Sequence, residues 1–252
     1  MASNTKNHAL LSLVLSWWCA AGCHKKFQET HASAATRRTS AMSIDLVTQI
    51  LAIMATVAYA VTGVMAVAEK RVDLFSAVVL GVIASVGGGT VRDLIMDVPV
   101  FWSQDLQLVR IAVAASLVTF FTMNYLSHPQ IYKAFLYIDG IGAALFGLGG
   151  AMKAYELGFA WPLGVLIMGV ISAIGGGVIR DVLTGRKTLL MSDEIYAVPV
   201  AIGCIALAAT LHFFPDRKSE ALLIGTLLAF TLRTAAIYWN MRLPVWFTTQ
   251  KK

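Results

Sequence analysis

Charged residues are scarce in this 252-residue chain: Asp, Glu, Lys and Arg together make up 13%, against 58% hydrophobic residues. Soluble globular proteins carry about 25% charged residues, because polar groups must cover much of their surface. A mean hydropathy of +0.71 agrees with the deficit. The composition therefore excludes an ordinary soluble domain and predicts a chain embedded in a lipid bilayer.

Acidic residues are also fewer than basic ones, 14 against 20, which gives a net charge of +6. A basic chain can bind nucleic acid, but here the Lys and Arg residues fall in short clusters between apolar runs and form no dense basic face. This placement is typical of the loops that flank membrane spans. We therefore predict no nucleic-acid partner.

Cysteine is rare, with Cys19, Cys23 and Cys204 in the whole chain. These residues form no CxxC pair and no cysteine–histidine group with metal-ligand spacing. The sequence also has no Ser/His/Asp set and no paired carboxylates of the kind that hydrolases use. We therefore predict no metal, no cofactor and no enzymatic activity.

The first 41 residues differ from the rest of the chain. An apolar stretch over 9–22 is shorter than the roughly 20 residues of a membrane span but fits a signal-peptide core. A polar segment follows, and Met42 stands directly before the first strong apolar run. Residues 1–41 are therefore a signal-like leader or sequence upstream of the true start at Met42, with an organelle transit peptide as a third alternative.

From Ile44 onward, apolar runs of about 20 residues alternate with short charged or proline-containing breaks. This pattern predicts an all-α integral membrane protein with seven transmembrane helices. The expected helices are 44–68, 73–96, 106–126, 133–154, 161–183, 195–214 and 219–240. We assign 42–128 to a first three-helix repeat, 129–214 to a second, and 215–252 to the seventh helix and a cytoplasmic tail.

The loop charges predict the orientation of the chain. Seven spans place the two termini on opposite faces of the membrane. The face with the C-terminus collects eight basic loop residues and the other face four, leaving out the leader. Because cytoplasmic loops carry the excess of Lys and Arg, we predict a cytoplasmic C-terminus and an N-terminus outside.

The strongest pattern is an internal repeat. Segment 81–93, Gly-Val-Ile-Ala-Ser-Val-Gly-Gly-Gly-Thr-Val-Arg-Asp, recurs over 169–181 as Gly-Val-Ile-Ser-Ala-Ile-Gly-Gly-Gly-Val-Ile-Arg-Asp. Upstream, 59–63 matches 146–150 at nearly the same offset. Each unit therefore spans three helices. Because three is odd, the second unit enters the membrane inverted relative to the first, as in many transporters whose solute site lies between the repeats.

Three consecutive glycines stand in the middle of each repeated helix: Gly87, Gly88 and Gly89, then Gly175, Gly176 and Gly177. Each weakens a helix by about 1 kcal/mol relative to Ala. Two compatible interpretations follow. The glycines kink or unwind the helices, so that freed carbonyls line a solute path with Ser85 and Ser172, or they let two helices approach closely.

A polar stripe runs along each repeated helix at spacings of three and four residues. Its members are Ser85, Gly89 and Arg92 in the first copy and Ser172, Gly176 and Arg180 in the second. A polar stripe on an otherwise apolar helix is expected to face the interior of the protein.

Charged residues follow each glycine run, as Arg92-Asp93 and Arg180-Asp181. Adjacent helical residues point about 100° apart, so we expect each of these residues to pair with another helix rather than with its neighbour. Asp139, in the fourth helix, is the expected partner of Arg180. Charges at this depth are functional candidates, here a charged lock or gate, with a purely structural salt bridge as the alternative.

A Gly-Gly-Gly-x-x-Arg-Asp motif in two copies resembles the bacterial two-repeat glycine-transporter-domain family, related in fold to the trimeric intracellular cation (TRIC) channels. The resemblance covers about 42–239 and leaves out the leader, since family members start near Met42. It implies a bacterial inner (plasma) membrane protein, a homotrimer, and a pore in each protomer lined by kinked second and fifth helices. It also places Asp139 at an acidic position that opens the second repeat.

Two transport functions fit this architecture. The main expectation is a permeation protein for glycine or a similar small neutral solute. The alternative is a TRIC-like monovalent cation (potassium) channel, and a further alternative is a membrane scaffold or sensor that transports nothing. Arg92 and Arg180 would repel cations unless paired, which favours a gated or carrier mechanism.

Overall fold

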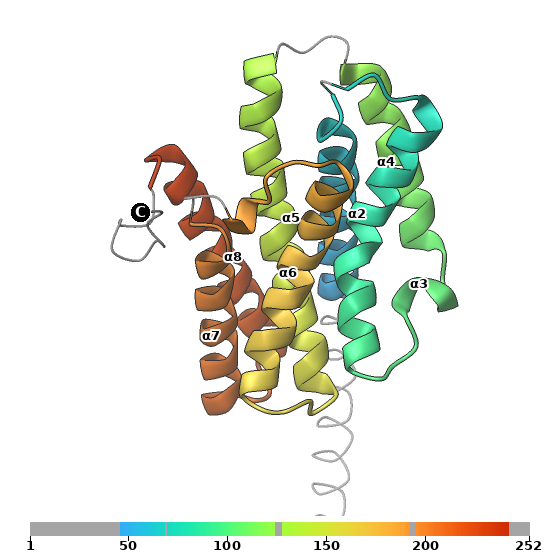
Figure 1. The fold of residues 1–252 in the computed structure, drawn as a ribbon. Helices are drawn as coiled ribbons and strands as arrows, with labels where there is room; N and C mark the ends of the chain where they lie inside the picture. The colour runs from blue at the N-terminus through green and yellow to red at the C-terminus, as the bar shows by residue number, and fades with distance from the viewer. Residues whose placement is uncertain (1–45, 69, 124–127, 192–194, 242–252) are drawn as a thin grey trace, which may run out of the picture. The chain divides into compact units, whose positions relative to one another are not determined.

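The computed structural model describes residues 46–68, 70–123, 128–191 and 195–241 (Figure 1). The expected leader, 1–41, and most of the expected cytoplasmic tail lie outside these residues. All packing reported below lies within the unit Val47–Lys252.

Each of the seven expected helices corresponds to a helix in the described part of the chain. Their bounds are Leu46–Met65 for the first helix, then α2 Leu74–Ile95, α4 Gln107–Thr122, α5 His128–Glu156, α6 Leu163–Leu183, α7 Ala197–Phe213 and α8 Lys218–Tyr238. The described residues form no strand. The fold of this part is therefore all-helical.

Five of these helices are long and apolar enough to cross a bilayer, which requires about 20 residues. The other two, α4 and α7, have 16 and 17 residues and are also apolar. Large apolar side chains such as Phe75, Val118 and Leu227 are at least 60% exposed. Soluble proteins rarely expose so many large apolar side chains to water, so these outward faces are suited to contact with lipid.

Two short helices occupy segments that the sequence assigned to loops. They are α3, Phe101–Gln104, and the 3-10 helix η2, Leu189–Met191. Each begins eight residues after the aspartate of an Arg-Asp pair, Asp93 or Asp181. The internal repeat therefore extends beyond the motif that reveals it.

Helix α6 lies at the centre of the packing. It contacts α5 and α2 along its length and also packs against α7, while α5 and α7 both contact α8 (Figure 1). Both repeated segments thus lie side by side, since α2 carries the first copy and α6 the second. The polar stripe of each copy is buried, as predicted.

Candidate functional site

The two glycine runs make the contact between α2 and α6. A Cβ atom at Gly88 would collide with the carbonyl oxygen of Ser172, and one at Gly176 with the carbonyl oxygen of Ala84. A Cβ at Gly175 would lie 2.9 Å from Gly88 Cα. Because these neighbours are backbone atoms, they cannot move aside by rotating a side chain. Glycine is needed here so that the two helices approach closely.

The other three glycines face side chains. A Cβ at Gly87 would lie 2.9 Å from Ile179 Cδ1, and one at Gly89 would lie 2.6 Å from the ring of Phe101. Gly177 faces polar atoms, which are described below. The Ser85 hydroxyl donates a hydrogen bond to the carbonyl of Thr56 at 3.1 Å, and the Ser172 hydroxyl donates to the carbonyl of Met168 at 2.6 Å.

Both helices remain α-helical through their glycine runs. The expectation that these segments unwind is therefore wrong for the described structure. Intrahelical hydrogen bonds keep the backbone satisfied, and the close approach of α2 to α6 offsets the weak helix propensity of glycine. A kink at either run, and a role in the solute path, remain predictions.

The first charge cluster is built around Asp93, which is fully buried. Its Oδ1 accepts hydrogen bonds from Arg92 Nε and from Lys153 Nζ, both at 2.8 Å. Its Oδ2 accepts the backbone N–H of Phe101 at 3.0 Å. One carboxylate thus faces two cations, so this cluster has one positive charge in excess.

The second charge cluster is built around Arg180, which is also fully buried. Arg180 Nε donates to Asp181 Oδ1 at 2.8 Å. Arg180 Nη1 donates to Asp139 Oδ1 at 2.6 Å and to Thr62 Oγ1 at 2.9 Å. The predicted pairing of Asp139 with Arg180 is confirmed. Here one cation faces two carboxylates, so the excess is negative.

The two clusters share one local geometry. In both, the arginine Nε bonds to the adjacent aspartate, and the second oxygen of that aspartate accepts an N–H from eight residues further on, which is Leu189 at 3.3 Å in the second copy. The expectation that neighbouring Arg and Asp do not pair is therefore wrong. A guanidinium on a long side chain can fold back across the 100° between adjacent positions.

The clusters differ in the partner that the rest of the chain supplies. Lys153 of α5 approaches Asp93, whereas Asp139 of the same helix approaches Arg180. Asp93 and Arg180 therefore each have an ion-pair partner on another helix, as expected. Helix α5 brings a cation to one cluster and an anion to the other.

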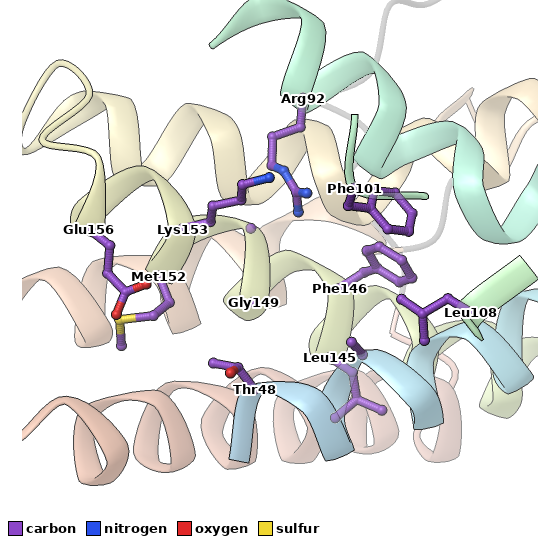
Figure 2. A pocket seen from close by; sticks show the side chains of 12 residues that line it. Thr48, Arg92, Phe101, Leu108, Leu145, Phe146, Gly149, Met152, Lys153 and Glu156 are labelled. Carbon is purple, nitrogen blue, oxygen red and sulfur yellow. The ribbon is translucent and has the colours of Figure 1, made fainter. Parts of the chain in front are cut away.

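One cavity adjoins the first cluster and has a volume of about 370 Å³. We call it the Arg92 cavity. Figure 2 shows Lys153 reaching toward Arg92, with Thr48 on the opposite side of the space. The rings of Phe101 and Phe146 lie against each other with centroids 6.5 Å apart.

A second cavity, of about 310 Å³, includes Arg186 among its lining residues, and we call it the Arg186 cavity. The guanidinium groups of Arg180 and Arg186 both stack on the Phe135 ring at 4.5 Å from its centroid. Lys70 also lines this cavity and donates to the carbonyl of Thr184. The Arg186 cavity therefore borders the second cluster.

The two cavities lie at opposite ends of the same two helices. The first helix contributes Thr48, near its start, to the Arg92 cavity and Met65, its last residue, to the Arg186 cavity. Helix α5 runs the opposite way: Tyr132, near its start, lines the Arg186 cavity, and Lys153, near its end, lines the Arg92 cavity.

Buried side chains occupy the first helix and α5 between the residues of these helices that line the two cavities. The Tyr59 hydroxyl donates to the carbonyl of Ala173, and its ring packs on Phe146 with centroids 5.8 Å apart. Tyr59, Asp139 and Arg180 are each at most 1% exposed. We call these three residues the buried layer.

Several residues of the site escaped the sequence analysis. Lys153 was counted only as one of the four basic loop residues on the face of the N-terminus, because its contact with Asp93 is between residues far apart in the sequence. Tyr59 and Thr62 fall within the repeated segment 59–63, which was used only to set the repeat length. Tyr196 had no sequence signal, because it follows a break between helices.

Apolar outer faces, helices of membrane-spanning length and compensated buried charges together define a multi-helix membrane protein. The family model described as "Glycine transporter" matches the chain twice, over 49–124 and 136–212. The chain belongs to this family.

Relatives support the assignment. The chain is 36% identical over 197 residues to the UPF0126 inner membrane protein YadS of Escherichia coli K12, covering 77% of this chain and 93% of the relative. It is 34% identical to the UPF0126 membrane protein YvgT of Bacillus subtilis, covering 62% and 76%.

Solved structures of similar fold are described as cation channels. One is the TRIC trimeric intracellular cation channel orthologue from Rhodobacter sphaeroides, with a TM-score of 0.72 and 33% identity over 77% of this chain and 99% of that one. Another is a prokaryotic TRIC channel in 0.5 M KCl, with a TM-score of 0.73 and 29% identity over 79% and 99%.

Proposed function

We propose that this protein is a monovalent cation channel and that the described structure is its closed form. The observation that carries the proposal is the pair of cavities at opposite ends of the first helix and α5, separated by the buried layer. Transporters and channels both need access from each face and a barrier between.

The charge balance of the second cluster supports cations as the permeant species. Arg180 is held by both Asp139 and Asp181, so the second cluster is negative and favours a cation nearby. The first cluster carries the opposite excess through Lys153. A cation that follows the proposed path must pass Lys153 at this cluster and also Lys70 and Arg186, which line the other cavity. These cations are the electrostatic barriers in the proposed path.

The solved relatives support the same function, since their descriptions name cation channels and a trimer. By analogy we propose a homotrimer with one pore in each protomer. The first expectation, passage of glycine, is supported by the description of the family model alone.

We further propose that all seven helices span the membrane as two inverted three-helix units and one additional helix. Helices α4 and α7 would be about 24–26 Å long, slightly less than a bilayer core, and local thinning of the bilayer can accommodate such a difference. The loop charges favour a cytoplasmic C-terminus, and the relative YadS favours a bacterial inner membrane.

Flux measurements on purified protein in liposomes test the function. Potassium flux should rise above that of protein-free liposomes, and uptake of radiolabelled glycine should not. Glycine uptake without potassium flux would favour the carrier. Absence of both, with correctly folded protein, would favour a scaffold or sensor.

A further inference from the structure

The buried polar atoms without a hydrogen-bond partner among the described residues include three that lie around Gly177: Asp139 Oδ2, Arg180 Nη2 and the hydroxyl oxygen of Tyr196. Asp139 and Arg180 are 0% exposed, and Tyr196 is 4% exposed. A buried polar group without a partner is strongly destabilising, and most buried groups of this kind are bonded to protein or to an ordered water.

The three side chains converge on one glycine. A Cβ placed on Gly177 would lie 3.1 Å from the Tyr196 hydroxyl, 3.5 Å from Arg180 Nη2 and 3.8 Å from Asp139 Oδ1. The Tyr196 hydroxyl also lies close enough to Asp139 and Tyr59 to interact with both. These groups therefore surround the position that a side chain at Gly177 would occupy.

We propose that one water molecule binds between Gly177, Asp139, Arg180 and Tyr196. Its oxygen accepts a hydrogen bond from Arg180 Nη2, one of its protons goes to Asp139 Oδ2, and the Tyr196 hydroxyl is the third partner. Buried waters typically make about three such bonds to groups that are otherwise unsatisfied.

The chemistry of the three groups selects water over an ion. The Arg180 guanidinium can only donate and is positive, so it repels a metal ion. The Asp139 carboxylate can only accept and is negative, so it repels an anion. A small neutral molecule that both donates and accepts satisfies all three groups at once. This inference does not depend on the proposed channel function.

Matched substitutions at Gly177 test the site. Gly177→Ala inserts a methyl group that excludes the water and replaces none of its hydrogen bonds. Gly177→Ser inserts the same carbon together with a hydroxyl that can replace the water. We expect the Ala variant to melt at least roughly 3 °C below the Ser variant in detergent.

The order of the two melting temperatures is informative because side-chain size and helix propensity both favour the Ala variant over the Ser variant. Ala has the higher helix propensity, and Ser is the larger side chain, so packing and propensity alone favour Ala. Gly149 of α5 is the control, because a Cβ there would meet nothing within 4 Å. At position 149 the Ala variant should be at least as stable as the Ser variant.

A high-resolution experimental structure of the unmodified protein provides the second measurement, which does not depend on whether the variants fold. Density for one water within hydrogen-bond distance of Asp139, Arg180 and Tyr196 is the expected result. The proposal is overturned if Tyr196 bonds directly to Asp139 with no density between them, or if Ala is as stable as Ser at position 177. Neither result would affect the flux measurements.

Discussion

At the scale of single residues, Arg180 is the centre of the site. Its guanidinium bonds to Asp181, Asp139 and Thr62 and also stacks on Phe135. Its charge is therefore compensated within the protein. A buried charge becomes costly when its partner is removed, by roughly 3–5 kcal/mol in measured cases.

Arg180→Ala should therefore destabilise the protein more than Asp139→Asn does. The Arg180 substitution leaves two buried carboxylates, Asp139 and Asp181, without their cation, whereas in Asp139→Asn the arginine keeps Asp181. The double variant should recover part of the loss, with a coupling free energy of about 1–3 kcal/mol in denaturant unfolding. Strict additivity of the two losses would contradict the pairing.

Lys153 gives a second prediction at this scale. Lys153→Met should cost about 1–2 kcal/mol of unfolding free energy, because Asp93 loses one of its two cations but keeps Arg92. Lys218→Met is the control, since Lys218 is exposed and lies 3.5 Å from the exposed Glu156. Exposed pairs contribute about 0–1 kcal/mol. Equal losses in the two variants would contradict a special role for Lys153.

The sequence predicted some of these contacts and missed others for a physical reason. Asp139 and Arg180 could be paired because isolated charges in apolar helices need a partner of opposite sign. The bonds within Arg92-Asp93 and Arg180-Asp181 were missed because the direction of the Cα–Cβ bond says little about where a long guanidinium ends. Such reach depends on rotamers, which a helical repeat does not specify.

At the scale of helices, the contact between α2 and α6 is the feature most sensitive to side-chain size. Gly88→Ala should cost roughly 1–3 kcal/mol, because the new methyl group meets the carbonyl oxygen of Ser172. Gly149→Ala is the matched control and should be neutral or stabilising by up to about 1 kcal/mol. Thermal or denaturant unfolding of both variants checks this, and a neutral Gly88→Ala would show that the helices can separate freely.

The start of α2 gives a pH-dependent prediction. Asp73 caps this helix by accepting from the Ser76 hydroxyl at 2.6 Å and the Ser76 N–H at 3.0 Å. These bonds, the hydroxyl foremost, lower the pKa of Asp73 below its ordinary value of 3.8. The stabilisation is therefore complete above that value and is lost as the pH falls through the lowered pKa.

Asp73→Asn removes this titration while keeping a capping side chain. The melting difference between the native protein and Asp73→Asn should stay constant from about pH 7 to pH 5 and change below about pH 4. A difference that changes mainly between pH 5 and pH 7 would show that another group is responsible.

The presence of the seven helices was predictable because an apolar run long enough to cross a bilayer can satisfy its backbone hydrogen bonds in few ways other than as a helix. The glycine runs were harder, since helix breaking and close packing require the same residue. Only the neighbours of Gly88, Gly175 and Gly176 in space decide between them. The short helices α3 and η2 were missed because they are set by bonds to Asp93 and Asp181 rather than by hydrophobic periodicity.

At the scale of the whole molecule, the proposed channel has two cavities that border clusters of opposite excess charge. The Arg92 cavity borders the positive cluster and the Arg186 cavity borders the negative one. The buried layer separates them. Opening of the proposed channel would require that Tyr59 and the Asp139–Arg180 pair move aside, which is a change of packed side chains rather than of helix content.

Current through purified protein in a planar bilayer, with a higher KCl concentration on one side, tests this account most directly. We expect single-channel openings whose reversal potential lies close to the equilibrium potential of potassium, because the pore selects cations over chloride. A reversal potential near that of chloride, or uptake of radiolabelled glycine by the same preparation with no current at any voltage, would contradict the assignment as a cation channel.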